Sequence, residues 1–176
     1  MSELRKANFE GTFFVTFTVV GWIDVFTREM YCDEIIKNLI YCQKNKGLEI
    51  YAYVIMPSHI HLVVSRKEGL LSDWIRDFKS FMAKQIVAAI NANPQESRKE
   101  WLNYMFSYFA KGSKQNQDFM FWQKTNHPVE LYTEKVIEQK IDYIHNNPVE
   151  AGIVTQAEFY KYSSANIDGE LKIDIL

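Results

Sequence analysis

The sequence predicts an α+β domain built on a four-stranded antiparallel sheet with helices on one face. Segments that alternate polar and apolar residues are separated by stretches with helical periodicity, and a strand-turn-strand unit stands near the middle of the chain. Of the 176 residues, 47% are hydrophobic, which is ample for one core. We expect residues 1–176 to form a single domain with the order βαββαβ plus a C-terminal helix, a ferredoxin-like split βαβ arrangement.

The first strand and the first helix follow from residue type and spacing. Residues 12–20 are rich in β-branched and aromatic side chains, which predicts a strand that ends at residues 21–22 (Gly-Trp). Over residues 26–46 the apolar side chains recur at helical spacing. Gly47 follows at the position where a left-handed residue commonly stops a helix.

A β-hairpin is predicted from residues 49–56 and 59–65. Residues 57–58 (Pro-Ser) supply its turn, because proline fixes its own φ and cannot donate to a central ladder. Side chains alternate faces along a strand, so His59 and His61 point the same way. Two such imidazoles can form a metal-binding edge, or they can be partly buried histidines that bond to their neighbours, and this short motif alone does not decide between the two.

The second half of the chain predicts three further helices and the fourth strand. Helical stripes cover residues 72–92, 101–109 and 133–147, and the residue before a proline ends the last of these helices. The aromatic cluster in 101–109 either packs on the body or stacks on bases. Residues 119–124 (Phe-Met-Phe-Trp-Gln-Lys) are expected to be the fourth strand, and 171–176 alternates enough for a short strand in the tail.

The helix over 133–147 carries two polar side chains on one face. Tyr143 and Asn147 are related as i and i+4, so they are neighbours on this face, whereas His145 projects away from them. A tyrosine on a helix that faces a sheet usually serves packing. The alternative is that Tyr143 and Asn147 present a nucleophile and a ligand to the same space.

Composition and charge constrain the partners and the compartment. Twenty basic against twenty-two acidic residues give a net charge of −2, which is unusual for a nucleic-acid binder unless its charges are segregated. Aromatic residues make up 15% of the chain, which suits base stacking or a core. The start of the chain lacks the apolar segment of a signal peptide and no run is long enough for a membrane span. Cys32 and Cys42 are too far apart along one helix to form a disulfide, which is typical of a reducing compartment. From both observations we expect a cytoplasmic protein that does not bind membranes.

Four motifs, in this order, resemble those of a known family. They are His-Ile-His at 59–61, Phe-Trp-Gln at 121–123, Asp-Tyr-Ile-His-Asn-Asn-Pro-Val at 142–149 and Tyr-Ser-Ser-Ala at 162–165. Together they resemble the IS200-like transposases and, more closely, the REP-associated tyrosine transposases of the HUH endonuclease superfamily. The similarity covers nearly the whole chain.

The resemblance implies a role for each candidate site residue. His59 and His61 correspond to a metal-binding pair, Tyr143 to a nucleophilic tyrosine and Asn147 to a third polar ligand. The implied metal is Mg²⁺ or Mn²⁺, whereas nitrogen ligands by themselves would favour Mn²⁺ or Zn²⁺ over Mg²⁺. The implied activity is nicking and transposition of single-stranded DNA at hairpin-forming repeats through a 5′-phosphotyrosine, by a monomer or a homodimer.

Basic residues on the 72–92 helix are a candidate for DNA binding. Arg76, Lys79 and Lys84 fall largely off the apolar stripe of that helix. They form either a solvated helix face or, as the resemblance implies, a surface that tracks phosphates beside the histidines.

Two functions from other classes also fit the residues. The first is a non-catalytic module of ferredoxin-like form that binds single-stranded nucleic acid, in which Tyr143 only packs. The second is a metal-dependent hydrolase in which His59 and His61 activate water. Covalent capture of DNA by Tyr143 distinguishes the transposase from both.

Overall fold

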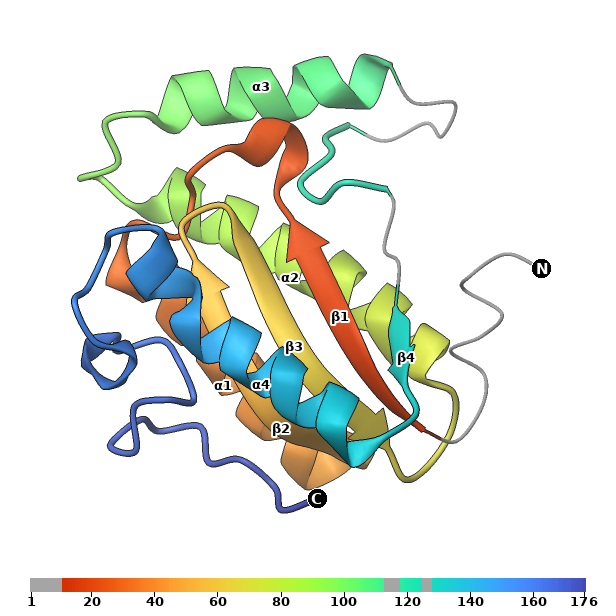
Figure 1. The fold of residues 1–176 in the computed structure, drawn as a ribbon. Coiled ribbons are helices and arrows are strands. Elements are labelled where there is room, and N and C mark those ends of the chain that lie inside the picture. The colour runs from red at the N-terminus through yellow and green to blue at the C-terminus, as the bar shows by residue number, and fades with distance from the viewer. Residues whose placement is uncertain (1–10, 113–117, 125–127) are drawn as a thin grey trace.

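The computed structural model describes residues 11–112, 118–124 and 128–176 (Figure 1). Its four strands form one antiparallel sheet in the order β2-β3-β1-β4. The strands are β1 (Thr12–Thr18), β2 (Leu48–Met56), β3 (His59–Arg66) and β4 (Val129–Leu131). The predicted fold class is therefore confirmed, with the histidine strand β3 at the centre of the sheet.

Helices cover both faces of this sheet. The α-helices are α1 (Glu29–Lys46), α2 (Leu71–Ala92), α3 (Lys99–Lys111) and α4 (Glu134–Glu150). Helices α1 and α2, which connect the strands, share one face as predicted, and the C-terminal helix α4 crosses the other face (Figure 1). In the part of the chain that is described, no helix is both long and apolar enough to cross a membrane.

The alternation of β1 and its neighbours divides the apolar side chains between two cores. Phe13 and Phe17 lie in the larger core under α1 and α2, whereas Phe14 lies in a second core with residues of α4. The buried members of the second core are Phe14, Tyr51, Ala52, Val54, Met56, Val63, Leu131, Ile137 and Ile144. This second core fixes α4 against the histidine side of the sheet.

The fourth strand lies later in the chain than predicted. Residues 119–124 form only a single bridge, between Trp122 and Val19, and they bury Phe121 and Trp122 in the larger core. The aromatic residues of this segment therefore fill the core and do not belong to a strand with a ladder of backbone hydrogen bonds. The fourth strand is β4, which has three residues and pairs with the start of β1.

Helix α4 begins as predicted but ends three residues later than Asn147. The Thr133 side chain accepts a hydrogen bond from the Val136 amide at 3.3 Å, so threonine caps the helix. Pro148 lies inside the last turn and is buried. Proline removes one helical hydrogen bond and its ring crowds the carbonyl four residues earlier, but its fixed φ suits a helix, and here the last turn continues past it to Glu150.

The C-terminal segment covers the free edge of β2. The Ile55 amide donates to the Tyr162 carbonyl and the Ser164 amide to the Tyr53 carbonyl, both at 2.9 Å. The Tyr-Ser-Ser-Ala motif thus protects a sheet edge. The strand expected at 171–176 is absent, although the Asp174 amide donates to the Ile50 carbonyl at 2.8 Å.

A buried carboxylate, which sequence reasoning missed, ties the loop before α3 to α1. Glu96 lies 2.7 Å from Arg28 Nε and 3.3 Å from Arg98 Nε, and it accepts a hydrogen bond from Tyr31 at 3.1 Å. Burial alone would raise the pKa of Glu96, but hydrogen bonds from the Arg98 backbone and from the two arginine side chains outweigh it and hold the pKa below its usual value.

We expect Glu96→Gln to lower the free energy of unfolding by about 2–4 kcal/mol, because it removes the charge partner of two partly buried arginines. Since the folded-state pKa is lowered, this contribution is present above the unfolded-state pKa of glutamate, about 4.3, and is lost as the pH falls through the folded-state value. Urea unfolding at neutral and acid pH measures both effects. Glu100→Gln, at an exposed glutamate of α3, is the control, and an equal loss in both variants would contradict the prediction.

Candidate functional site

Strand β3 places both histidines on the side of the sheet that α4 covers. His59 pairs with Thr18 and His61 with Thr16 of β1, and the ring centroids of the two histidines are 4.7 Å apart. His61 is buried, with 7% of its surface exposed. The shared orientation predicted from the His-x-His spacing is therefore present.

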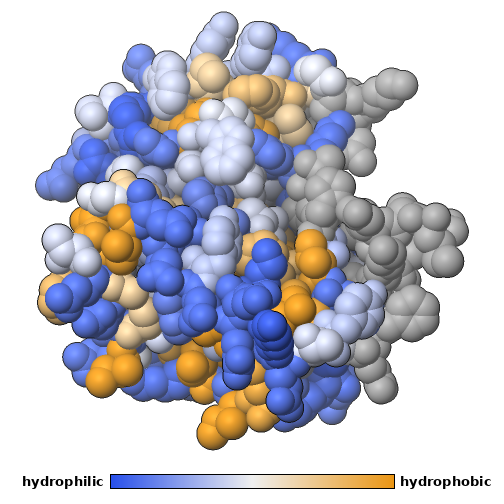
Figure 2. Space-filling model, in the orientation of Figure 1, coloured by the Kyte–Doolittle hydropathy of each residue, from blue (hydrophilic) through white to orange (hydrophobic). Residues whose placement is uncertain are grey.

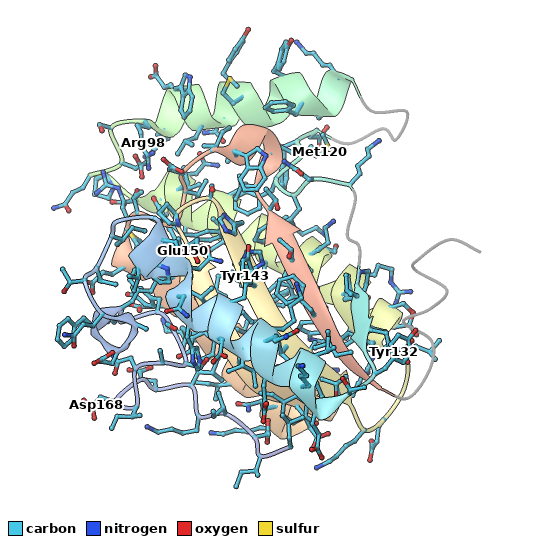
Figure 3. The ribbon with its side chains drawn as sticks, viewed as in Figure 1. Arg98, Met120, Tyr132, Tyr143, Glu150 and Asp168 are labelled. Atoms are coloured by element: carbon cyan, nitrogen blue, oxygen red, sulfur yellow. The ribbon has the colours of Figure 1, made fainter. Side chains whose placement is uncertain are left out.

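Helix α4 brings Tyr143 and Asn147 to these histidines. The Tyr143 ring centroid lies 5.4 Å from that of His61, on the side of α4 that faces the sheet (Figure 3). The Asn147 side chain lies close enough to the His59 ring to raise the pKa of that histidine. His145 points elsewhere, since its Nε2 lies 2.9 Å from Ser164 Oγ. Hydrophilic side chains cover most of the outward face of α4 (Figure 2), so the helix is amphipathic.

The two imidazoles are electrostatically suited to binding a cation. Burial, with smaller contributions from His59 and Lys140, lowers the pKa of His61 to about 3. Burial also lowers the pKa of His59, although the hydrogen bond to Asn147 and the charge of Asp24 oppose this shift. Both rings are therefore neutral at physiological pH, which is the form that coordinates metals.

Hydroxyl groups orient both rings. Thr16 Oγ1 lies 2.8 Å from His61 Nδ1, and Ser58 Oγ lies 3.2 Å from His59 Nδ1. The tautomer in which Nδ1 donates to these hydroxyls leaves the Nε2 lone pair of each ring for a ligand.

The donor set fits a divalent cation. Two neutral imidazoles from β3 and the Asn147 amide from α4 supply nitrogen and oxygen ligands and add no negative charge. Among residues 11–112, 118–124 and 128–176, no group of three His, Cys, Asp or Glu side chains could hold a metal. The candidate site has two histidines, and its third donor is the amide of Asn147, a residue type that is not among these four.

The comparison with protein families matches a segment that ends about two thirds of the way along the chain. Residues 23–120, more than half of the sequence, match the family model described as transposase IS200 like. The chain belongs to the IS200-like transposase family. The matched region includes His59 and His61, whereas Tyr143 and Asn147 lie beyond it. No curated protein matches the chain significantly.

Two solved structures resemble this IS200-like transposase. One is a REP-associated tyrosine transposase bound to a REP hairpin, with a TM-score of 0.61 and 21% identity over 100% of this chain and 99% of the other. The other is a putative transposase from Deinococcus radiodurans R1, with a TM-score of 0.45 and 16% identity over 78% of this chain and 91% of the other. The first likeness shows that the fold is shared.

Sequence reasoning missed three members of the candidate site. Thr16 orients His61, the Phe14 ring stacks on the His61 ring with centroids 5.1 Å apart, and Lys140 Nζ lies 5.3 Å from the Tyr143 ring centroid. Lys140 stands three residues before Tyr143, so the helical period could have placed it there. Thr16 and Phe14 are known only once the register between β1 and β3 is known.

The three basic residues proposed for DNA binding do not lie beside the histidines. Their helix α2 packs on the opposite face of the sheet. Arg76 pairs with Asp73 at 2.7 Å and with Asp77 at 2.9 Å, and Lys79 donates to the Gln123 carbonyl at 2.7 Å. Lys84 is exposed on the same helix. The expectation of a phosphate-tracking surface next to the histidines is therefore wrong in its location, because periodicity does not reveal which face of a sheet a helix covers.

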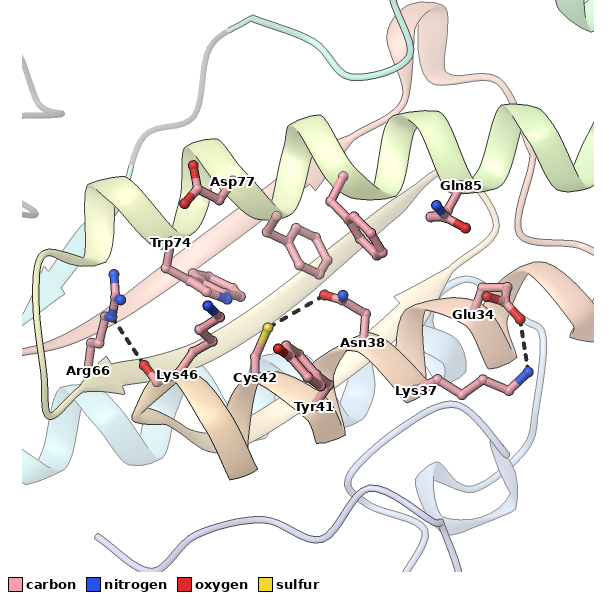
Figure 4. A pocket seen from close by; sticks show the side chains of 12 residues that line it. Glu34, Lys37, Asn38, Tyr41, Cys42, Lys46, Arg66, Trp74, Asp77 and Gln85 are labelled. Atoms are coloured by element: carbon pink, nitrogen blue, oxygen red, sulfur yellow. Dashed lines mark hydrogen bonds and ion pairs between the residues drawn. The ribbon is translucent and has the colours of Figure 1, made fainter.

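A pocket of about 570 Å³ lies between α1 and α2 (Figure 4). Trp74, Phe78 and Cys42 form part of its wall, on the face of the sheet opposite α4. Neither the histidines nor Tyr143 line it, so this pocket is separate from the candidate site.

Proposed function

We propose that this IS200-like transposase cleaves and rejoins single-stranded DNA at hairpin-forming repeats, with Tyr143 as its nucleophile. The observation that carries the proposal is the position of Tyr143, whose ring lies 5.4 Å from that of His61, on the same helix as Asn147, which is close enough to His59 to affect its pKa. The Tyr143 side chain is 42% exposed, so a DNA strand can reach it. A REP hairpin, which the structural relative binds, is the model for the substrate.

In the proposed reaction, the Tyr143 phenol oxygen attacks the scissile phosphorus and loses its proton to water, while the leaving 3′ oxygen takes up a proton from water. The bond between phosphorus and the 3′ oxygen breaks, so the products are a 5′-phosphotyrosine and a free 3′-hydroxyl. The reverse attack by a 3′-hydroxyl rejoins a strand without any further energy source.

Charges on the chain favour this attack. A tyrosine is ordinarily protonated at neutral pH, because its reference pKa is about 10. Lys140 Nζ lies over the rings of Tyr143 and Phe14, 5.3 Å and 4.8 Å from their centroids. Its positive charge stabilises the negative charge that develops on the phenol oxygen and also attracts the phosphate.

His59, His61 and Asn147 would hold a divalent cation, Mg²⁺ or Mn²⁺. A cation bound there would act as a Lewis acid toward the scissile phosphate. The chain's own contribution is to keep both imidazoles neutral by burial and to fix their rings through Thr16 and Ser58.

The decisive experiment is covalent capture. Wild-type protein is incubated with Mn²⁺ and with end-labelled single-stranded DNA taken from hairpin-forming sequences that flank the gene. We expect an adduct that survives denaturing electrophoresis and that mass spectrometry maps to the peptide containing Tyr143. Cleavage without an adduct would instead favour a metal hydrolase, and binding without cleavage on every hairpin would favour a non-catalytic module.

We expect Thr16→Val to lower the affinity for Mn²⁺ about 10- to 100-fold, because valine keeps the shape of threonine but removes the hydroxyl that orients His61. Titration calorimetry measures the affinity, and cleavage at saturating Mn²⁺ should stay close to the wild-type rate. Thr18→Val is the matched control, since Ser58 and not Thr18 supplies the hydroxyl at His59. Equal affinities in the two variants would refute the orienting role.

A further inference from the structure

The turn that follows β1 has a conformation that is unusual for the residues in it. Gly21 has a φ of 62° and Trp22 a φ of 56°, and the Ile23 amide donates to the Val20 carbonyl at 3.3 Å. Two successive residues with positive φ are typical of a type I′ turn, which prefers glycine, asparagine or aspartate. A tryptophan at such a position costs free energy and needs an explanation.

Burial does not explain Trp22. Its side chain is 59% exposed, so it contributes little to the core. The Trp22 ring centroid lies 5.3 Å from that of His59, with an angle of 73° between the rings. This edge-to-face arrangement leaves at least one indole face open beside the candidate metal-binding edge.

The surrounding structure holds this turn in place. A Cβ added to Gly21 would lie 2.7 Å and 2.9 Å from ring atoms of Phe109, so the α3 aromatic packs directly on the glycine backbone. The Val19 amide donates to the Ser58 carbonyl at 2.9 Å, which ties the turn to the hairpin that carries His59. The position of Trp22 relative to His59 is thus fixed by contacts on both sides.

We propose that Trp22 is a stacking residue for a base of the single-stranded DNA next to the phosphate that Tyr143 attacks. The inference rests on the proposed function and adds to it the residue that positions the substrate. Every base offers a π-face, so one exposed indole can hold any unpaired base. Trp22, His59, His61 and Tyr143 form a chain of neighbouring rings, with successive centroids 5.3, 4.7 and 5.4 Å apart, so the indole and the nucleophile flank the same pair of histidines.

Trp22→Gly separates this role from a structural one. Glycine adopts positive φ without strain, so we expect the variant to unfold at the wild-type temperature or above it. Its affinity for a cleavable oligonucleotide, measured by fluorescence anisotropy with EDTA in place of metal, should fall about tenfold or more. Trp22→Phe should restore part of the affinity. Tyr41→Ala, at an exposed aromatic on α1, is the control and should bind as the wild type does.

An abasic substrate identifies the base. An oligonucleotide that lacks the base next to the mapped cleavage site should bind the wild type as weakly as the intact oligonucleotide binds Trp22→Gly, and the two changes together should cost no more than either alone. Additive losses, wild-type affinity in Trp22→Gly, or a lowered unfolding temperature that Trp22→Phe does not correct would each overturn the inference. If the wild type forms no adduct, the proposed function fails and the inference fails with it, whereas an adduct together with additive losses refutes only the role of Trp22.

Discussion

Tyr143→Phe is expected to abolish strand cleavage and adduct formation while the protein stays folded. The change removes only the phenol oxygen, so the ring keeps its contacts with His61 and Phe14. The side chain is partly exposed, and we expect the free energy of unfolding to change by no more than about 0.5 kcal/mol. Loss of a covalent nucleophile typically lowers a rate on the order of 10³-fold or more. Single-turnover cleavage of labelled DNA measures the rate.

Tyr132→Phe is the matched control for this loss. Tyr132 also stands near α4, before its first turn, and its side chain is exposed (Figure 3). The Tyr132→Phe variant should cleave DNA at the wild-type rate and form the same adduct. Undiminished cleavage by Tyr143→Phe would instead indicate that water is the nucleophile.

Short-range signals made most of the fold predictable. The hairpin turn at Pro57 and Ser58 and the helix stop at Gly47 depend on the conformational limits of one or two residues, and both stand where expected. The fourth strand was missed because three residues, Val129–Leu131, carry too little alternation to be recognised. Residues 119–124 have strand-like composition, yet they serve the core through Phe121 and Trp122.

The candidate site was predictable to the extent that its residues lie on one element. The i, i+2 spacing of the histidines and the i, i+4 spacing of Tyr143 and Asn147 each place a pair on one face. The approach of these two pairs was expected from resemblance to a family, and the packing of α4 on β2 and β3 provides it. Thr16 and Trp22 join the site through strand register and turn geometry, which local patterns do not encode.

His61→Ala is the second change for which we expect a large effect. It removes one of three candidate ligands, so the affinity for Mn²⁺ measured by titration calorimetry should fall by a factor on the order of 10² or more, by analogy with the effect of losing outer-shell partners alone. Cleavage at limiting Mn²⁺ should be lost, and excess Mn²⁺ should restore it in part. His59→Ala should behave in the same way, whereas Asn147→Ala should be milder because water can replace an amide ligand.

His61→Ala also has a structural cost that the experiment must separate from metal binding. Thr16 loses its partner and Phe14 loses a stacked ring, so we expect the free energy of unfolding to fall by about 1–3 kcal/mol. Assays are therefore run well below the unfolding temperature of each variant. His145→Ala is the matched control, because this histidine lies on α4 but bonds Ser164 away from the site. If His61→Ala binds Mn²⁺ and cleaves as His145→Ala does, His61 is not a metal ligand.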